Sequence, residues 1–447
     1  MMKISIIGTG YVGLVTGVCL AEKGHQTICI DIDKEKIDRI GRGESPFFEP
    51  GLNDLLERNR GVRFAATTDL GKAILETDVT MIAVGTPFDG QSIDLSFIRE
   101  VSKNIGTVLR DKPSYHLVVV KSTVVPGTTD EVVLPLLEQY SGKRAGPDFG
   151  VGMNPEFLTE GEAIGDFMEP DRIVLGGIDK RSIDLLQDIY DGFKDVAMVR
   201  TNNKTAEMIK YASNALLATM ISFSNEIGNL CATLGGVDVV DVLRGVHLSQ
   251  YISLKLPDGN TVAPSIKGFL GAGCGFGGSC LPKDVKALIV HGEKAGSPMP
   301  LLSAVISINR GQYRKVIDLL KKHFPSLRSK RVAVLGLSFR PDTSDMRESP
   351  AIPIINELLA EGAAVKAYDP VANAEAMRIF GADTTVRFCG SLEEALRDVD
   401  GAILVTRWEE FRRIPELLRG MERPPVFVDG RRMLEKTSFP NYEGIGL

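Results

Sequence analysis

The stretch Gly8-Thr9-Gly10-Tyr11-Val12-Gly13 decides the expected fold. An apolar run at residues 4–7 precedes it, and apolar residues at helical spacing follow it at 12–23. In a GxGxxG between a strand and a helix, the first glycine permits a tight turn and the second lets the backbone approach a pyrophosphate. The third lets the helix pack on the strand. The pattern therefore predicts a strand–turn–helix unit that binds a dinucleotide through residues 8–13.

Asp31 ends the second predicted strand, residues 27–31, and lies 18 residues after Gly13. A carboxylate at this position accepts hydrogen bonds from a ribose and repels a 2′-phosphate, so the predicted cofactor is NAD rather than NADP. Lys36, Thr86 and Thr123 are the other expected cofactor contacts near this loop. For the two threonines, which follow later strands, turn formation is the alternative.

Strand and helix patterns alternate over both ends of the chain, and a length of 447 residues favours two or three domains. The middle differs, because apolar residues at 204–234 recur at helical spacing and predict one helix of ~45 Å. The expected fold class is α/β, with two Rossmann-like doubly wound domains joined by a long central helix. The expected domains are 1–200, 201–325 and 326–447.

Composition excludes several classes of protein. Hydrophobic residues make up 43% and charged residues 25% of the chain, which is typical of a globular protein. The net charge is −6 without a basic run, so we expect no nucleic-acid partner. The apolar N-terminus is interrupted by glycines, which favours a strand over a signal peptide, and we expect no membrane partner. Six cysteines without a CxxC pair indicate no metal site, no disulfide framework and a cytoplasmic setting.

The segment at residues 275–284, Gly-Phe-Gly-Gly-Ser-Cys-Leu-Pro-Lys-Asp, contains the candidate nucleophile. Pro282 suits the first turn of a helix running to residue 291, which places Cys280 at the helix N-terminus. That position and the neighbouring Lys283 favour the thiolate form of Cys280, the form that attacks carbonyl carbon. A buried structural role is the alternative for any cysteine, and we expect that role for the other five, including Cys274.

Five motifs occur in the same order as in the UDP-glucose/GDP-mannose dehydrogenases, and the chain resembles that family over essentially its whole length. They are GTGYVG, Asn154-Pro155-Glu156-Phe157-Leu158, the run EMIKYASN at residues 207–214, the cysteine segment GFGGSCLPKD, and residues 336–340 with 347–350. The resemblance implies an NAD-binding domain at 1–200 and a central helical dimerisation or connector domain with the catalytic loop at 201–325. It implies a nucleotide-sugar (UDP) binding domain at 326–447.

The resemblance implies an NAD-dependent four-electron oxidation of the C6 alcohol of a nucleotide sugar, through a thiohemiacetal and a thioester on Cys280. The expected substrate is UDP-glucose and the product UDP-glucuronate, which supplies uronic acid for polysaccharide synthesis. GDP-mannose or another nucleotide sugar is the alternative. A catalytically silent NAD-binding or sugar-sensing module is a further alternative. Such a module would not need Cys280, Lys210 and Asp284 together, yet all three residues are present.

Residues that match the family's functional positions are expected to act as theirs do. The implied catalytic residues are Cys280, Lys210, Asn214, Asp284, Glu156 and Thr123. Further implied cofactor contacts are Glu160, Lys283 and Arg347. The implied substrate contacts are Glu156, Phe157, Leu158, Glu160, Lys210, Asn214, Phe269, Leu270, Gly271, Ala272, Gly273, Gly277 and Arg340.

Residues 251–266 depart from the family pattern and resemble an insertion, with a turn expected at Pro257-Asp258-Gly259. The arginine that in the family reaches the partner subunit's sugar has no evident match there. The long central helix and the family resemblance together imply a homodimer or a higher homo-oligomer.

Overall fold

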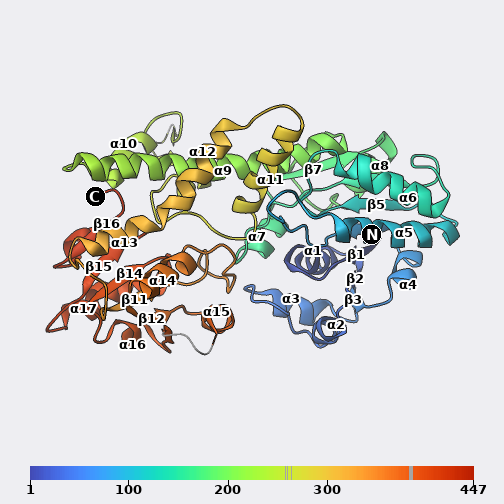
Figure 1. The fold of residues 1–447 in the computed structure, drawn as a ribbon. Helices are drawn as coiled ribbons and strands as arrows, with labels where there is room; N and C mark the ends of the chain where they lie inside the picture. Colours follow the sequence, from blue (N-terminus) through green and yellow to red (C-terminus); the bar gives the residue numbers. More distant parts are fainter. Residues whose placement is uncertain (257, 259, 263, 382–385) are drawn as a thin grey trace. The chain divides into compact units, whose positions relative to one another are not determined.

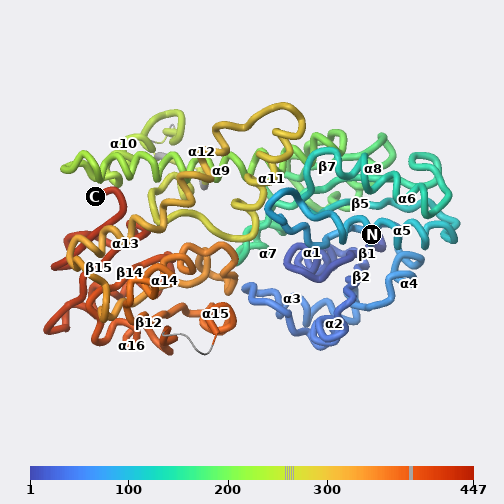
Figure 2. The backbone as a smooth tube through the Cα atoms, in the orientation of Figure 1, coloured from blue at the N-terminus to red at the C-terminus, as the bar shows by residue number. Residues whose placement is uncertain are grey.

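The computed structural model describes residues 1–256, 258, 260–262, 264–381 and 386–447. The chain divides into two compact units, Met1–Ser213 and Asn214–Leu447. Figure 2 follows the chain from the first unit, in blue and teal, to the second, in yellow and red.

The first unit contains an eight-stranded sheet in the order β3-β2-β1-β4-β5-β6-β7-β8 (Figure 1). Only the pairing of β6 with β7 is antiparallel. The central strands β4, β5 and β6 are buried along their whole length, as expected where helices cover both faces of a sheet. The strands are β1 Lys3–Ile7, β2 Gln26–Ile30, β3 Phe64–Thr67, β4 Val79–Ile82, β5 Leu117–Val120, β6 Gly150–Met153, β7 Arg172–Gly177 and β8 Ala197–Thr201.

Two hydrophobic cores lie on the two faces of this sheet. Alternate residues of β5 enter different cores, because successive side chains on a strand point to opposite faces: Leu117 and Val119 enter one, Val118 and Val120 the other. The helices of the unit are α1 Tyr11–Glu22, α2 Lys34–Gly41, α3 Leu52–Asn59, α4 Leu70–Leu75, α5 Ser96–Asp111, the π-helix Thr129–Val133, α6 Leu134–Ser141, α7 Ala163–Met168 and α8 Lys180–Asp188.

The long helix predicted at residues 204–234 is confirmed as α9, Asn203–Leu234, drawn in green in Figure 1. It has 32 residues, and the boundary between the two units falls within it. Lys210 and Asn214 lie one helical turn apart on α9 and therefore project from the same face.

The second unit continues with short helices and a hairpin before its main sheet begins. These elements are α10 Val239–His247, β9 Leu254–Lys255, β10 Thr261–Val262, the 3-10 helix Ser265–Phe269, α11 Leu281–Lys294, α12 Pro300–Gln312 and α13 Arg314–Lys321. The antiparallel pair β9–β10 occupies part of the expected insertion at 251–266. The turn expected at residues 257–259 lies mostly outside the described residues.

The main sheet of the second unit has six parallel strands in the order β13-β12-β11-β14-β15-β16. This is the order of the first six strands of the first unit, so the prediction of two Rossmann-like doubly wound domains is confirmed. The strands are β11 Arg331–Leu335, β12 Ala364–Tyr368, β13 Val386–Phe388, β14 Gly401–Leu404, β15 Val426–Asp429 and β16 Tyr442–Gly444. The helices are α14 Ala351–Ala360, α15 Asn373–Phe380, α16 Leu392–Leu396, the 3-10 helices Glu409–Arg413 and Lys436–Ser438, and α17 Ile414–Arg419. The C-terminus returns to α10, where the Val239 N–H donates to the Gly446 carbonyl (2.9 Å).

Candidate active site

The predicted cofactor loop connects β1 to α1 and has the backbone that a bound dinucleotide needs. Gly8 has φ +102°, and a side chain there would meet the Ala83 carbonyl oxygen at 2.5 Å. A side chain at Gly13 would collide with the Gly8 carbonyl. Gly10, by contrast, faces open space, and α1 begins after it without a side-chain cap. The first N–H groups of α1 are therefore available to a pyrophosphate, so the loop fits NAD.

Asp31, predicted as the last residue of the second strand, directly follows β2, and its carboxylate is already oriented by the loop. One oxygen accepts hydrogen bonds from the Thr9 N–H (2.9 Å) and hydroxyl (2.6 Å), and the other accepts from the Asp33 N–H (3.0 Å). Burial opposes ionisation of Asp31, but these hydrogen bonds and the charge of Lys36 hold its pKa below the usual value. The ionised carboxylate retains lone pairs for ribose hydroxyls.

Glu49, which is not among the predicted site residues, connects the cofactor loop to the segment that carries Glu160. The Glu49 side chain is buried and accepts hydrogen bonds from the Tyr11 hydroxyl and from the N–H groups of Gly161 (2.7 Å) and Ala163 (2.8 Å). The Gly161 N–H also lies 2.9 Å from the Tyr11 oxygen. Glu160 precedes Gly161, so this cluster positions two of the predicted contact regions together. Its members are too distant in sequence for a local motif to reveal them.

A buried ion pair joins two of the predicted catalytic residues. Lys210 Nζ lies 3.0 Å from Glu156 Oε1, and both side chains are about 5% exposed or less. The other carboxylate oxygen of Glu156 accepts from the Leu158 N–H (2.7 Å). Burial opposes ionisation of Glu156, but Lys210, this hydrogen bond and Lys121 together hold its pKa below the usual value. The ring of Phe157 lies near the Lys210 ammonium and stacks under the guanidinium of Arg172, at 3.8 Å.

Thr123 and Thr86 lie together beyond the carboxyl ends of β5 and β4, where ligands bind in open α/β sheets. The Thr86 hydroxyl donates to the Thr123 carbonyl oxygen (2.7 Å). The chain after Thr123 is anchored to α9 by Glu207, whose buried carboxylate accepts from the N–H groups of Gly127 (2.5 Å) and Thr129 (2.8 Å). Glu207 was not identified from the sequence, because its partners lie about 80 residues away.

In the second unit, Cys280 directly precedes α11, and Pro282 lies in the first turn of that helix, as predicted. Cys280 is half-buried, whereas the other five cysteines are buried. Asp284, also in the first turn, is buried and accepts from the Asn214 side-chain amide (2.7 Å). Lys283 Nζ lies 2.8 Å from the other Asp284 oxygen. The Cys280 thiol at the N-terminus of α11 thus lies one helical turn from the Asp284 carboxylate, which the Asn214 amide and the Lys283 ammonium hold in place.

The glycines before Cys280 allow close packing against residues 339–348. A side chain at Gly277 would collide with the Glu348 carbonyl, and one at Gly278 would meet the Phe339 ring at 2.8 Å. The Gly278 N–H donates to the Arg347 carbonyl oxygen (2.8 Å). Arg340 follows Phe339 and is half-buried. The structure therefore brings the cysteine segment to the predicted substrate and cofactor arginines, and the Arg347 guanidinium binds Asp345 (2.6 Å).

The predicted substrate segment Phe269, Leu270, Gly271, Ala272 and Gly273 runs beside the carboxyl ends of β14 and β15. The Gly273 N–H donates to the Asn225 side chain (2.7 Å). Arg431, which was not identified, donates to the Gly275 carbonyl oxygen (2.8 Å), and Arg407 donates to the Arg431 carbonyl oxygen (2.6 Å). Both arginines follow predicted strands at the ligand-binding edge of the sheet, and that position could have identified them.

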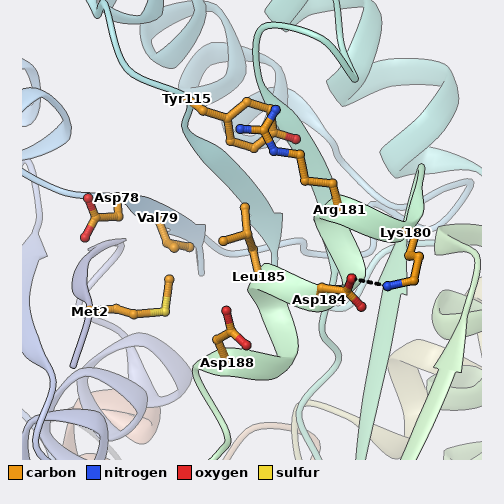
Figure 3. A pocket seen from close by; sticks show the side chains of 9 residues that line it. All are labelled: Met2, Asp78, Val79, Tyr115, Lys180, Arg181, Asp184, Leu185 and Asp188. Atoms are coloured by element: carbon orange, nitrogen blue, oxygen red, sulfur yellow. Dashed lines mark hydrogen bonds and ion pairs between the residues drawn. The ribbon is translucent and has the colours of Figure 1, made fainter.

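A cavity of about 700 Å³ opens at the opposite edge of the first sheet (Figure 3). It is lined by residues that precede β1, β4 and β5 and by α8, including Asp78, Tyr115 and Arg181. The Arg181 guanidinium stacks on the Tyr115 ring at 3.3 Å. Of the residues that the structure describes around this cavity, none is a predicted site residue.

Within the described ranges, no group of three or more His, Cys, Asp or Glu side chains could hold a metal ion. None of the described helices is long and apolar enough to span a membrane.

Three family models match the chain, and together they cover most of its length. The NAD binding domain of the UDP-glucose/GDP-mannose dehydrogenase family matches residues 2–194, its central domain residues 204–311, and its UDP binding domain residues 333–436. The chain belongs to the UDP-glucose/GDP-mannose dehydrogenase family. It is therefore a nucleotide-sugar dehydrogenase that uses NAD, and the cofactor predicted from Gly8–Gly13 and Asp31 is confirmed.

Relatives within this dehydrogenase family differ in the substrate that their names state. A UDP-glucose 6-dehydrogenase of Haloferax volcanii is 42% identical, with 99% of this chain and 100% of that protein aligned. A GDP-mannose 6-dehydrogenase of Pseudomonas aeruginosa is also 42% identical, over 86% of this chain and 84% of that protein. The solved structure of a UDP-glucose dehydrogenase from Pyrobaculum islandicum is 37% identical, with TM-score 0.90 over 100% of this chain and 98% of that one.

Proposed function

We propose that this dehydrogenase oxidises C6 of UDP-glucose to the carboxylate of UDP-glucuronate, with Cys280 as a covalent nucleophile. The observation that carries the proposal is the environment of Cys280, which is half-buried at the start of α11 while the other five cysteines are buried. Removal of four electrons from an alcohol passes through an aldehyde, and a thiolate can retain that aldehyde covalently.

The proposed bond changes need only water and NAD besides the sugar alcohol and Cys280. The C6 alcohol first loses a proton and a hydride to become the aldehyde. The Cys280 thiolate adds to the aldehyde carbon, and loss of a second hydride from the resulting thiohemiacetal gives a thioester. Water then attacks the thioester carbon, the carbon–sulfur bond breaks, and the thiolate is restored. NAD, when bound, accepts one hydride in each oxidation, so the alcohol and one water yield one carboxylate, two NADH and three protons.

The residues around these steps have properties that suit their proposed roles. Lys210 and Asn214 project from one face of α9, and we assign them to the C6 oxygen, whose negative charge an ammonium and an amide N–H stabilise. Asp284, held by Asn214 and Lys283, accepts protons. Glu156, kept ionised by Lys210, directs the water that hydrolyses the thioester, with Thr123 bonded to the same water.

GDP-mannose is the second candidate substrate, because GDP-mannose 6-dehydrogenases are as similar in identity as the UDP-glucose enzymes. One observation supports UDP-glucose. The Haloferax enzyme aligns over 99% of this chain and 100% of its own, whereas the GDP-mannose 6-dehydrogenase of Pseudomonas aeruginosa aligns over 86% and 84%.

Purified protein assayed with UDP-glucose, UDP-galactose, GDP-mannose and UDP-GlcNAc tests the substrate. We expect UDP-glucose to give the highest kcat/KM and to yield two NADH for each uronate. A higher kcat/KM with GDP-mannose would overturn the proposed substrate. One NADH per sugar, with free aldehyde in solution, would overturn the covalent mechanism.

A pair of cysteine variants tests the nucleophile. Cys280→Ser should abolish net formation of the uronate, because a serine hydroxyl does not provide the thiolate. Cys274→Ala is the matched control, since Cys274 directly precedes the cysteine segment but is buried. The control should retain turnover. Uronate formation by Cys280→Ser at the wild-type rate would remove Cys280 from the mechanism.

We also propose the three-domain division at 1–200, 201–325 and 326–447, and a homodimer formed through α9. Leu216, Phe223 and Leu230 recur every seven residues on α9 and are about half exposed, a spacing that suits packing against a second copy of the helix. Light scattering should give the mass of a dimer for the wild type and of a monomer for Phe223→Glu. A monomeric wild type would overturn this assembly.

A further inference from the structure

Two buried lysines, not one, lie near the carboxylate of Glu156. Lys210 forms the ion pair already described. Lys121 follows β5 directly and is 3% exposed, and its ammonium donates to the Asn154 side-chain oxygen (2.8 Å) and lies 3.4 Å from the Asn154 carbonyl oxygen. Its charge acts on both Glu156 and Lys210. Lys121 is not among the residues predicted to act in the site.

Asn154 transmits the position of Lys121 to Glu156. Asn154 follows β6 and precedes Glu156 by two residues, with Pro155 between them. Its side-chain oxygen accepts from both Lys121 and the Tyr190 hydroxyl (2.5 Å), and its amide donates to the Val174 carbonyl oxygen (2.9 Å). All of these atoms are buried, so the Asn154 side chain has one orientation, and the backbone leading to Glu156 begins from a fixed point.

A comparison with another buried lysine shows that Lys121 is unusual. Lys112 is also 3% exposed, but its three N–H groups meet three carbonyl oxygens, of Ile74, Leu75 and Thr77, at 2.8–3.0 Å. Lys121 is bonded to one asparagine, and no carboxylate of the described residues lies within 4 Å of its nitrogen. Burying an ammonium in this way is costly. Lys121, Lys210 and Glu156 together place two positive charges and one negative charge in a buried region.

We propose that Lys121 is a positioning residue for C6 oxidation, which fixes Asn154 and Glu156 and keeps this buried region positively charged where negative charge develops on the sugar. The proposal rests on the proposed function. Proton loss from the C6 alcohol, addition of the thiolate to the aldehyde and hydrolysis of the thioester each place negative charge on a C6 oxygen. A net positive region favours these charged species over the neutral alcohol. Lys121 does not exchange a proton with the sugar.

The charge of Lys121 is sensitive to pH. Burial lowers the pKa of Lys121 to about 8; the charge of Glu156 opposes this shift, and the smaller effect of Lys210 adds to it. Tyr190, the other titratable group on the shared asparagine oxygen, is neutral over this range because burial raises its pKa. The contribution of Lys121 should therefore be present below pH 8 and disappear above it.

Binding of the product and of the substrate, measured by calorimetry without NAD, tests this proposal. Lys121→Met removes the charge but keeps most of the side-chain volume, and Lys112→Met is the matched control for loss of a buried lysine. At pH 7 we expect Lys121→Met to bind UDP-glucuronate about tenfold more weakly than the wild type does, the effect that one pKa unit in a neighbouring group represents. Its affinity for UDP-glucose should be unchanged. Lys112→Met should lower the thermal stability and leave both affinities unchanged.

A second measurement uses the wild type alone, so the test does not depend on the folding of a variant. The preference of the wild type for UDP-glucuronate over UDP-glucose should fall between pH 7 and pH 9, and this change should be absent in Lys121→Met. An unchanged preference in Lys121→Met, or the same loss in Lys112→Met, would overturn the role of Lys121. A wild type that binds neither ligand would instead overturn the proposed function.

Discussion

Replacing Glu156 by glutamine tests the buried ion pair that the first unit contributes to the candidate active site. The side chains of Glu156 and Lys210 are 5% and 4% exposed, and the charged atoms are 3.0 Å apart. Removing one partner of a buried pair costs about 3–5 kcal/mol, because the remaining charge stays away from water. Glutamine keeps the shape of the side chain and can still accept a hydrogen bond from the Leu158 N–H. We therefore expect Glu156→Gln to lower the unfolding free energy by about 3 kcal/mol, the lower end of this range.

Urea unfolding at pH 7, followed by far-UV circular dichroism, measures this cost. The matched control is Asp38→Asn, which breaks the exposed pair of Asp38 with Lys34 and should cost less than about 0.5 kcal/mol. The double variant Glu156→Gln/Lys210→Met removes both buried charges and should cost less than the sum of the two single changes. The reasoning is refuted if Glu156→Gln costs no more than Asp38→Asn.

The difference in unfolding free energy between the wild type and Glu156→Gln should depend on pH, and the direction of this dependence tests its electrostatic origin. Because the folded-state pKa of Glu156 lies below its usual value, the ion pair stabilises the fold fully above about pH 4.3, the unperturbed glutamate value. The stabilisation should be lost as the pH falls through the lower, folded-state pKa. The wild type and Glu156→Gln should therefore differ most near pH 7 and converge in acid. A difference that grows in acid would contradict this electrostatic origin.

Three further predictions concern other residues. Asp31→Asn should reduce the preference for NAD over NADP by about tenfold in kcat/KM, because the ribose loses a charged acceptor and a 2′-phosphate meets less repulsion; an unchanged ratio would remove Asp31 from cofactor selection. Iodoacetamide under native conditions should label Cys280 alone, as determined by peptide mass spectrometry, because the other five cysteines are buried; labelling of another cysteine first would contradict this. Glu49→Gln should lower the unfolding free energy by about 1–3 kcal/mol, more than Tyr11→Phe, because two N–H groups lose a charged acceptor; equal effects would show that the tyrosine bond dominates.

Features that depend on neighbours in sequence were predictable. The turn at Gly8, the helix that begins after Gly10 and the aspartate at the end of β2 all follow from backbone sterics and periodicity within a short stretch. The apolar spacing alone predicts a helix over 204–234, and the structure has it at Asn203–Leu234. Cys280 was placed at a helix N-terminus because Pro282 suits the first turn.

Short and exposed elements were less predictable. The strand β8 is mostly exposed and shows no apolar alternation, and β3 has only four residues. Each is held in the sheet by pairing with a neighbouring strand, β7 and β2 respectively. Their formation therefore depends on a partner that is already folded, and their own residues carry little signal.

The sequence by itself determined the two Rossmann-like folds, the cofactor loop and Cys280 as the candidate nucleophile, and its resemblance to the family implied the other candidate catalytic residues. The tertiary structure alone decided which charges meet. Lys121 bonds to Asn154, which is 33 residues away in the sequence. Glu207 accepts from Gly127 across 80 residues, and Glu49 accepts from Gly161 across 112 residues. The physical reason is that a charge has a defined partner only after burial removes water as the alternative, and burial is a property of the complete fold.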